Sequence, residues 1–406
     1  GLNFMKRPFA LIGITYLSVQ AALFYLESDL AAAILTAVCF IGTIVSLFIL
    51  KNRNLRHTVL CFCLTAAFAS TIFSGYNIFV KQPIVDKYSE REIYVTATVL
   101  EQPTVQYDTY RYLIETDSIN GKIEKLKICL STINELNVEE FDRISCVLPL
   151  KECTKSQMIA DGAFLQASVN KNFAYIVKKT DDKPLYYQAV KIRENFADSF
   201  EQNMSQDCAS LCRAVLLGEK TALSQEIQND FTRCGVSFLI VVSGMHLAII
   251  SSFVFLCIKK IIKNRVLRSM IMLICAFSFM AVTGFAPSVV RAGVMLAVVY
   301  SGKMFMRKGD SLNSLGIAAL ILTVPNPTAV ADVGMLLSFT ATLGIILWAR
   351  KISVYIMGKF AKLKRLKKPV EFTVNLFAVS VSAAVWTMPI SVLMFGKVSV
   401  FSILLS

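Results

Sequence analysis

Charged side chains are scarce in this sequence. Asp, Glu, Lys and Arg make up only 17% of its 406 residues, whereas they make up roughly a quarter of soluble globular domains. Hydrophobic residues reach 55%, and the mean hydropathy is positive. The shortage of charge excludes an ordinary soluble protein and predicts a polytopic α-helical membrane protein.

Metal-binding side chains are scarce as well. The sequence contains two histidines, His57 and His246, and no paired CxxC arrangement. Structural zinc sites need four Cys or His ligands at short, regular spacing. We therefore expect neither a metal site nor a cofactor.

Five of the eleven cysteines lie in two contrasting settings. Cys61 and Cys63 lie inside an apolar run, where a thiol behaves as a small apolar side chain. Cys129, Cys146 and Cys153 lie in a polar block. If that block is extracellular, a disulfide between two of these three is open, and the sequence does not indicate which two would pair.

Three long apolar runs open the chain, from Pro8 to Leu26, Leu30 to Leu50 and Thr58 to about Val80. Each is long enough to cross a hydrocarbon core of roughly 30 Å as a helix. A signal peptide is the alternative for the first run, but no small-residue cleavage site follows it. The further predicted membrane segments are Gly235–Ile258, Val266–Gly284, Pro287–Met304, Leu312–Val324, Val333–Trp348, Phe372–Phe395 and an unfinished run from Val398. Leu312–Val324 is short, and a re-entrant segment is the alternative for it.

A different pattern fills the stretch from Lys81 to about Lys183. Apolar and polar residues alternate there, in stretches rich in Val, Ile, Thr and Tyr that turn residues separate. Such alternation predicts short antiparallel strands, and about five of them favour a small closed β-barrel over an open sheet with exposed edges. The clearest strands are Ile93–Leu100, Tyr110–Glu115, Leu126–Leu130 and Phe173–Val177.

Helices follow the predicted barrel. The stretch from Pro184 to Ser205 predicts an amphipathic helix, and two more helices are expected at Asp207–Leu217 and Ser224–Arg233. The predicted apolar face of the first consists of Tyr187, Val190, Phe196 and Phe200.

The net charge of +14 indicates orientation. If the N-terminus is cytoplasmic, every short basic loop falls on the cytoplasmic side, including Arg350 to Lys368 with its eight Lys and Arg, as the positive-inside rule requires. The barrel then lies outside. From Lys81 to Glu201, sixteen Lys and Arg stand against nineteen Asp and Glu. Charge alone therefore gives little support to nucleic-acid binding.

Polar side chains inside membrane segments are costly, and each is a functional candidate by default. The candidates lie near the predicted outer ends of three helices, where we expect them to share a polar cavity. They are Ser243, Gly244, His246, Arg291, Asp332 and Ser338.

Structural interpretations compete with these functional ones. Ser243 and Gly244 are small residues of the kind that permit close helix packing. His246 has the alternative interpretation of a buried histidine whose hydrogen bonds are satisfied within the protein. Arg291 suits an ion pair with Asp332 or a side chain that reaches the membrane interface. A Ser/His/Asp hydrolase is a further interpretation, although two residues three apart on one helix do not by themselves make a nucleophile and its base.

Four segments resemble, in their order and spacing, the ComEC family of competence proteins, the inner-membrane channels for transforming DNA. The resemblance covers residues 209–406, and the three-helix start with its barrel is similar to the family's N-terminal region. The segments are Leu216–Leu223 with Phe231–His246, which ends in Val-Ser-Gly-Met-His, then Pro287–Ala292, Asp332–Phe339 and Pro389–Ser399.

The resemblance implies a multi-pass protein of the cytoplasmic membrane that translocates single-stranded DNA and catalyses no reaction. The implied fold is a polytopic α-helical membrane protein with an inserted small, OB-like, extracellular β-barrel. The implied partners are single-stranded DNA, the lipid bilayer, other competence proteins such as a DNA receptor and a cytoplasmic ATPase, and a second copy in a homodimer. The expected divisions are 1–80 for three transmembrane helices, 81–183 for the barrel, 184–234 for connecting helices and 235–406 for the channel domain.

The resemblance also implies roles for the candidate residues. Arg291 would contact phosphate, Asp332 would position Arg291, and Ser243 and His246 would line a constriction. Phe238 stands where the family usually has histidine, and Leu336 where it usually has glutamine; both departures remove polar groups from the expected path.

Two other function classes remain open at this stage. One is a polytopic membrane enzyme that acts on lipid or cell-wall precursors, and the weaker one is a small-molecule transporter, for which no inverted repeat is evident. Many relatives carry a C-terminal metallo-β-lactamase-like domain. The chain stops at Ser406 inside an apolar stretch, and its first plausible start is Met5, so we expect a fragment.

Overall fold

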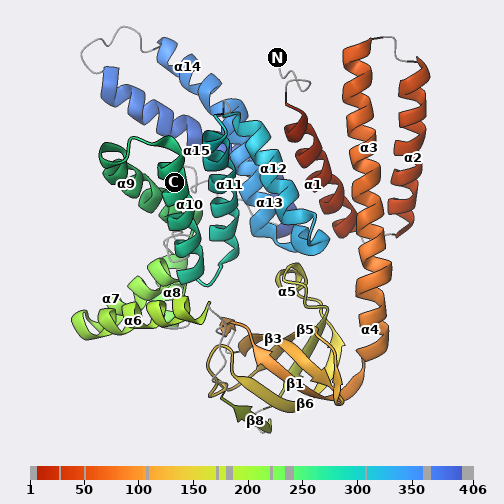
Figure 1. The fold of residues 1–406 in the computed structure, drawn as a ribbon, viewed down its shortest axis with the longest axis vertical. Helices are drawn as coiled ribbons and strands as arrows, with labels where there is room; N and C mark the ends of the chain where they lie inside the picture. Colours follow the sequence, from red (N-terminus) through yellow and green to blue (C-terminus); the bar gives the residue numbers. More distant parts are fainter. Residues whose placement is uncertain are drawn as a thin grey trace.

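The computed structural model describes residues 7–26, 29–49, 52–101, 103–106, 109–170, 173–179, 186–219, 223–233, 242–306, 309–359 and 367–395. Helices form most of the molecule, and a β-barrel lies at one end of it (Figure 1). Six described helices are long and apolar enough to cross a membrane. The predicted polytopic helical fold with an inserted barrel is confirmed. Phe238 and the run from Val398 lie outside the described residues.

The first three apolar runs form helices α1 (Pro8–Leu26), α2 (Asp29–Ile49) and α3 (Arg53–Tyr76). Helix α1 also packs against α12 (Ser311–Thr323), which is far away in the sequence. The two backbones touch at this crossing, because a Cβ built on Gly13 would lie 2.1 Å from the carbonyl oxygen of Gly316. Small residues permit such close approach between membrane helices. The crossing therefore joins the N-terminal helices to the helices that follow the barrel in the sequence.

The third helix continues beyond Val80, where the sequence predicts its end. One π-helical turn, η2 (Asn77–Lys81), leads directly into α4 (Gln82–Tyr88). Pro83 has no N–H to donate within a helix. The wider turn accommodates it, since the N–H of Gln82 donates to the carbonyl oxygen of Asn77, five residues back. This continuous helix carries the chain from the other helices to the barrel (Figure 1).

Five strands close the barrel in the order β1, β3, β5, β7, β6 and back to β1. The β5–β7 pair is parallel, and the other neighbouring strands are antiparallel. Alternate side chains such as Ile114, Ile128 and Leu148 fill the interior. The closed OB-like barrel is confirmed. Its strands are β1 (Arg91–Val99), β3 (Thr109–Ile119), β5 (Lys127–Thr132), β6 (Arg143–Glu152) and β7 (Leu165–Val169).

Three shorter strands lie outside this closed ring. Strands β2 (Thr104–Gln106) and β4 (Lys122–Ile123) pair with β3, and β8 (Tyr175–Lys178) pairs with β6. The predicted strand at Phe173–Val177 corresponds to β8. That segment extends the sheet and does not help to close the barrel.

The three barrel cysteines, Cys129, Cys146 and Cys153, are buried and free, so no disulfide joins them. Burial raises the pKa of Cys146 to about 12 and also raises the pKa values of Cys129 and Cys153. A thiol needs its thiolate form to react. These side chains therefore serve as small apolar residues of the barrel.

The helices after the barrel are α6 (Tyr187–Asn203), α7 (Gln206–Cys212), the π-helical η3 (Arg213–Leu217) and α8 (Gln225–Arg233). The predicted apolar face of α6 is wrong in part. Val190 is buried, but Phe196 is exposed. Arg193 is buried instead, because two carboxylates, of Glu140 and Glu219, contact its guanidinium group.

The second helical group begins with α9 (Gly244–Ile261), α10 (Arg265–Val282) and α11 (Pro287–Met304), and continues after α12 with η6 (Pro327–Ala331), α13 (Val333–Gly344), η7 (Ile345–Ala349), α14 (Arg350–Lys359) and α15 (Lys367–Phe395). The predicted basic loop from Arg350 is helical over its first ten residues, since α13 runs through a π turn into α14. Basic side chains do not end a helix that emerges from an apolar environment.

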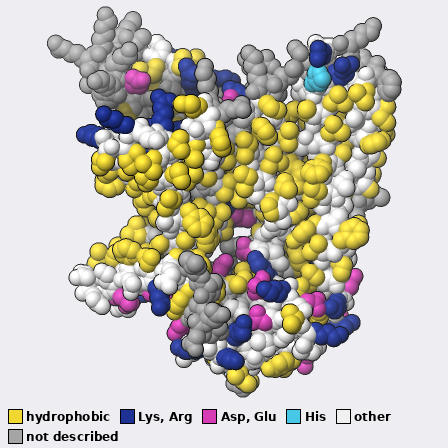
Figure 2. All heavy atoms as spheres, viewed as in Figure 1, with side chains coloured by type: hydrophobic (Ala, Val, Ile, Leu, Met, Phe, Trp, Pro, Cys, Tyr) yellow, Lys and Arg dark blue, Asp and Glu magenta, His cyan; other side chains and the backbone are white. Residues whose placement is uncertain are grey.

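Charged side chains lie at both ends of the helical part. Hydrophobic side chains form a broad band over the helices, with mainly Lys and Arg above the band and charges of both signs on the barrel below it (Figure 2). Arg7, before α1, forms an ion pair with Asp310, before α12, through a 2.7 Å contact between Nε and Oδ2. This contact places the start of α1 and the connection between α11 and α12 at one end, as alternate crossings require.

Candidate functional site

An ion pair between a buried arginine and a partly buried aspartate joins two of the helices near the barrel. Arg291 lies one turn inside α11, which Pro287 begins. Its Nη1 lies 2.7 Å from Oδ2 of Asp332, and the two side chains are 10% and 23% exposed. Oδ1 of Asp332 accepts the N–H of Gly334 at 2.9 Å and so caps α13. Asp332 thereby fixes both the start of α13 and the position of the Arg291 guanidinium group.

A cavity of about 250 Å³ adjoins this pair. Its wall comes partly from the membrane helices and partly from the barrel, through α5 (Ser156–Ala160), which lies between β6 and β7. Asn326 joins the two parts, since its Nδ2 donates to the carbonyl oxygen of Ala160 at 2.6 Å. The polar lining residues are Gln157, Asp161, Arg291, Asn326 and Asp332.

Asp161 is the barrel's own carboxylate in this cavity. Burial raises its pKa to about 6, while Lys127 lowers the pKa and Asp332 raises it. A carboxyl in a poorly solvated site with another carboxylate nearby favours its neutral form. The cavity therefore contains one permanent cation, already paired, and a carboxyl that titrates near neutral pH.

The barrel face that OB-folds commonly use is covered. Such barrels bind oligonucleotides on the face of their second and third strands and at the loops that join strands one to two and four to five. Here those strands are β3 and β5, and their outward residues Leu113 and Cys129 pack under Met158 and Phe164, with Ala331 of η6 in the same cluster. The loop between the fourth and fifth strands contains α5, so that loop lies against the cavity.

Ser243, Gly244 and His246 lie at the start of α9. The backbone N–H of Ser243 donates to Nδ1 of His246 at 3.1 Å, and the Ser243 hydroxyl lies 3.1 Å from the same nitrogen. Nδ1 is therefore an acceptor, which places the ring hydrogen on Nε2. The two residues complete a capping box at the helix end. Among the described residues, no hydrogen bond or ion pair connects His246 to Asp332, so the geometry gives the hydrolase interpretation no support.

Gly244 allows α9 to approach α11. A Cβ at this position would lie 2.7 Å from the Cβ of Ala292, and the hydroxyl of Ser288 donates to the carbonyl oxygen of Val242 at 2.7 Å. Ser288 and Ala292 are one turn apart on α11, on a face adjacent to that of Arg291. The close-packing interpretation of Gly244 thus has direct geometric support.

The predicted shared cavity contains only part of the predicted set. Arg291 and Asp332 line it, whereas Ser243, Gly244, His246 and Ser338 are not among its lining residues. Ser338 is half-buried on α13. Leu336 packs in an apolar cluster with Leu17 and Phe339 of α1 and α13. A glutamine at this position would have to place its amide among apolar side chains.

Sequence reasoning missed two lining residues of the barrel, Gln157 and Asp161, and Asn326, which caps η6 in the helical part. Gln157, Asp161 and Asn326 are ordinary polar residues in loops or short helices, and nothing in their local pattern marks them. Only the contact between α5 and η6, 166 residues apart at Asn326 and Ala160, brings them to Arg291. A list of polar residues inside apolar runs could not include them.

The fold and the cavity define a class: a multi-helix membrane protein with an OB-like barrel packed over a buried ion pair. Residues 215–406 match the sequence model of the family described as "Competence protein". ComE operon protein 3 of Bacillus subtilis (strain 168) is 20% identical over 325 residues, which cover 78% of this chain and 41% of that protein. No solved structure matches the chain. The two sequence matches confirm the resemblance to the ComEC family of competence proteins.

The chain spans about two fifths of the length of that relative, since the aligned region covers 41% of it. The region that matches the family model, residues 215–406, includes the start of α9, Arg291 and Asp332.

Proposed function

We propose that this chain forms the membrane channel through which one strand of transforming DNA crosses the cytoplasmic membrane during natural competence. The barrel lies on the outer side, and the basic helix ends lie in the cytoplasm, as the positive-inside rule requires. The competence match covers all the helices from α8 onward. Barrel and helices meet at the cavity, where a strand that leaves the barrel would reach the helices.

The observation that carries this proposal is the buried Arg291–Asp332 pair at a cavity shared with the barrel. A buried arginine is costly unless it is paired, and its planar donors suit phosphate as well as carboxylate. Phosphate from a DNA strand would replace Asp332 as the partner of Arg291. Asp332 holds the guanidinium group in place until then.

The structure corresponds to a closed state in this proposal. Ligand pockets usually measure about 300–1,000 Å³, and this cavity, of about 250 Å³, is smaller. Passage of a strand would require α5 to move away from η6, with loss of the hydrogen bond between Asn326 and Ala160. Movement of α5 would also uncover the β3–β5 face.

The other candidate residues at the start of α9 would hold α11 in position beside the path. Ser243 and His246 fix the first turn of α9, and Gly244 keeps that turn against α11, the helix that carries Arg291. Ser338 follows Asp332 by six residues on α13, further from the barrel, where the proposed path would continue beyond the cavity. The enzyme alternative requires His246 as an acid or base held by a carboxylate, and its Nδ1 bonds to the backbone N–H of Ser243 in the helix cap instead.

DNA uptake in a transformable host tests the role of Arg291. The host's own gene is deleted and replaced by this chain joined to the host protein's remaining parts, and internalised labelled DNA is measured. We expect Arg291→Ala and Asp332→Asn each to reduce uptake at least tenfold; Asn retains the helix cap, so Asp332→Asn should fold. Lys351→Ala, an exposed residue of α14, is the control for loss of one charge.

Protein level in the membrane fraction separates loss of transport from loss of folding. Uptake by Arg291→Ala at the wild-type level, with normal protein level, would remove Arg291 from the path. A loss of uptake by Lys351→Ala of equal size would show that the effect is not specific to the cavity.

A further inference from the structure

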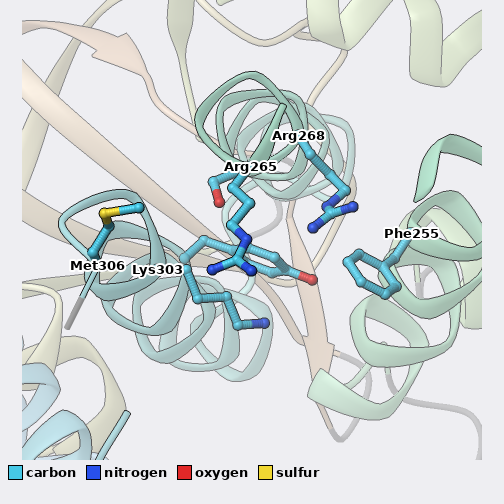
Figure 3. A pocket seen from close by; sticks show the side chains of 7 residues that line it. Phe255, Arg265, Arg268, Lys303 and Met306 are labelled. Carbon is cyan, nitrogen blue, oxygen red and sulfur yellow. The ribbon is translucent and has the colours of Figure 1, made fainter. Parts of the chain in front are cut away.

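A second cavity lies at the end of the helices opposite the barrel. It measures about 420 Å³ and lies between the last turns of α9 and α11 and the first turns of α10. Three basic side chains line it: Arg265 and Arg268 from α10, and Lys303 from α11. Figure 3 shows their charged ends directed into one space, with the ring of Phe255 beside them.

Among the described residues, none neutralises the positive charge of this cavity. No Asp or Glu lines it, and none of the three basic residues forms an ion pair within the described ranges. Aromatic rings hold two of them in place: Nζ of Lys303 lies 4.4 Å from the ring centre of Tyr300, and the Arg268 guanidinium lies 5.4 Å from that of Phe255. Three cations around one cavity repel one another, so an anion would stabilise this arrangement.

We propose that this cavity binds the phosphate head group of an anionic phospholipid. Its volume lies within the usual range for ligand sites, about 300–1,000 Å³, and basic pockets between membrane helices are suited to such head groups. The surroundings favour a lipid over a soluble phosphate. Val266, Met270 and Phe305, next to the basic residues in the sequence, expose 43%, 47% and 76% of their surface, and acyl chains would cover them.

Native mass spectrometry of the purified chain in a neutral detergent tests this site. Bound dioleoyl phosphatidylglycerol is compared with bound dioleoyl phosphatidylcholine, which has the same chains and no net charge. The test variant is Arg265→Gln/Arg268→Gln/Lys303→Gln. The control, Lys259→Gln/Lys260→Gln/Lys351→Gln, removes the same charge from exposed residues on α9 and α14.

We expect wild type and control to prefer the anionic lipid, and the test variant to bind it at least tenfold more weakly, since each basic residue near an anionic surface contributes about fivefold. Circular dichroism checks that the helices remain. If the triple variant fails to fold, Arg265→Gln alone should lose about fivefold. Equal binding by the folded test variant and the control would overturn the proposal.

Soluble competitors identify the source of the phosphate. Excess inorganic phosphate and a single-stranded oligonucleotide should each leave the bound phosphatidylglycerol in place. Displacement by inorganic phosphate would show a site for free phosphate, and displacement by the oligonucleotide would assign the cavity to a DNA path. Either result would overturn the lipid assignment without affecting the proposed role of Arg291.

Discussion

Arg193→Met tests whether a buried ion cluster holds the barrel against the following helices. Arg193 lies on α6, and its side chain is 5% exposed. It contacts Glu140, in the β5–β6 connection of the barrel, and Glu219, whose Oε1 lies 3.2 Å from its Nε. Glu219 also contacts Arg213 at 2.8 Å. Methionine keeps an unbranched side chain of similar reach and removes the cation that the two carboxylates share.

The expected loss follows from the burial of these partners. Removal of one member of a buried ion pair costs about 3–5 kcal/mol, because the remaining charge is left uncompensated. Glu219 keeps Arg213, so we expect the lower end, about 3 kcal/mol. In Arg193→Met/Glu140→Gln the second buried charge is removed too. That variant should recover about 2 kcal/mol of the loss.

The loss should depend on pH. Burial raises the pKa of Glu140, and Arg193 lowers it, so the pKa rises further in Arg193→Met. A carboxyl whose pKa is higher in the folded than in the unfolded state stabilises the fold below its unfolded pKa, and this contribution disappears as pH rises through the folded pKa. The difference between wild type and Arg193→Met should therefore be smaller at about pH 5 than at about pH 8.

Unfolding of the purified proteins in detergent, followed by circular dichroism at both pH values, measures these differences. Proteolysis within the β5–β6 connection reports whether the barrel separates from α6 first. A loss below about 1 kcal/mol, the level of an exposed pair, or a loss that is the same at both pH values, would refute the reasoning.

Three further predictions use the same unfolding measurement. Asp161→Asn should be more stable than wild type by at least about 1 kcal/mol at about pH 8, and the difference should shrink as pH falls from about 6 to about 4, because burial raises the pKa of Asp161 to about 6 and its ionisation opposes folding from the unfolded pKa upward. Gly13→Leu should destabilise the protein by more than about 3 kcal/mol, since α1 and α12 would have to separate at Gly316, whereas Gly75→Leu, with nothing within 4 Å of its Cβ, should have little effect. Ser243→Ala should cost about 1 kcal/mol through loss of the α9 cap, and an unchanged stability would contradict the capping role.

Hydropathy located the membrane helices well because a long apolar run has few alternatives. The runs Pro8–Leu26 and Pro287–Met304 match α1 and α11 residue for residue. It failed where a helix leaves the apolar region and continues. Residues 81–88 and 350–359 are polar enough to suggest connections, yet π turns carry α3 into α4 and α13 into α14.

The sequence predicted that a small barrel is present, but not the order in which its strands pair. Alternation in residues 93–100 and 110–115 predicts one buried face, which β1 has. Strand β3 buries both faces around Leu113, because this outward residue packs under Met158 and Phe164. Nothing local shows which strands are neighbours, and β8 alternates like the others while it lies outside the closed ring. Register and closure depend on pairings far apart in the sequence.

The sequence predicts a site residue only where its side chain is energetically costly inside a membrane segment. Arg291 and Asp332 are expensive inside a membrane segment, so each is conspicuous alone, and their pairing follows from equal depth. Arg193 was not conspicuous, because an arginine in an amphipathic helix normally faces water. Its burial depends on Glu140 and Glu219, which lie 53 residues before it and beyond the end of the next helix.

The charges around the first cavity constrain how a DNA strand could use it. Arg291 is neutralised by Asp332, and Asp161 adds a carboxyl that is ionised above about pH 6. In the closed state the residues that line the cavity therefore carry one net negative charge above about pH 6, which opposes phosphate. Movement of α5 would carry Asp161 away with the barrel and leave Arg291 and Asp332 behind. The same motion that widens the cavity would thus remove its excess negative charge, so opening and phosphate binding at Arg291 would favour each other.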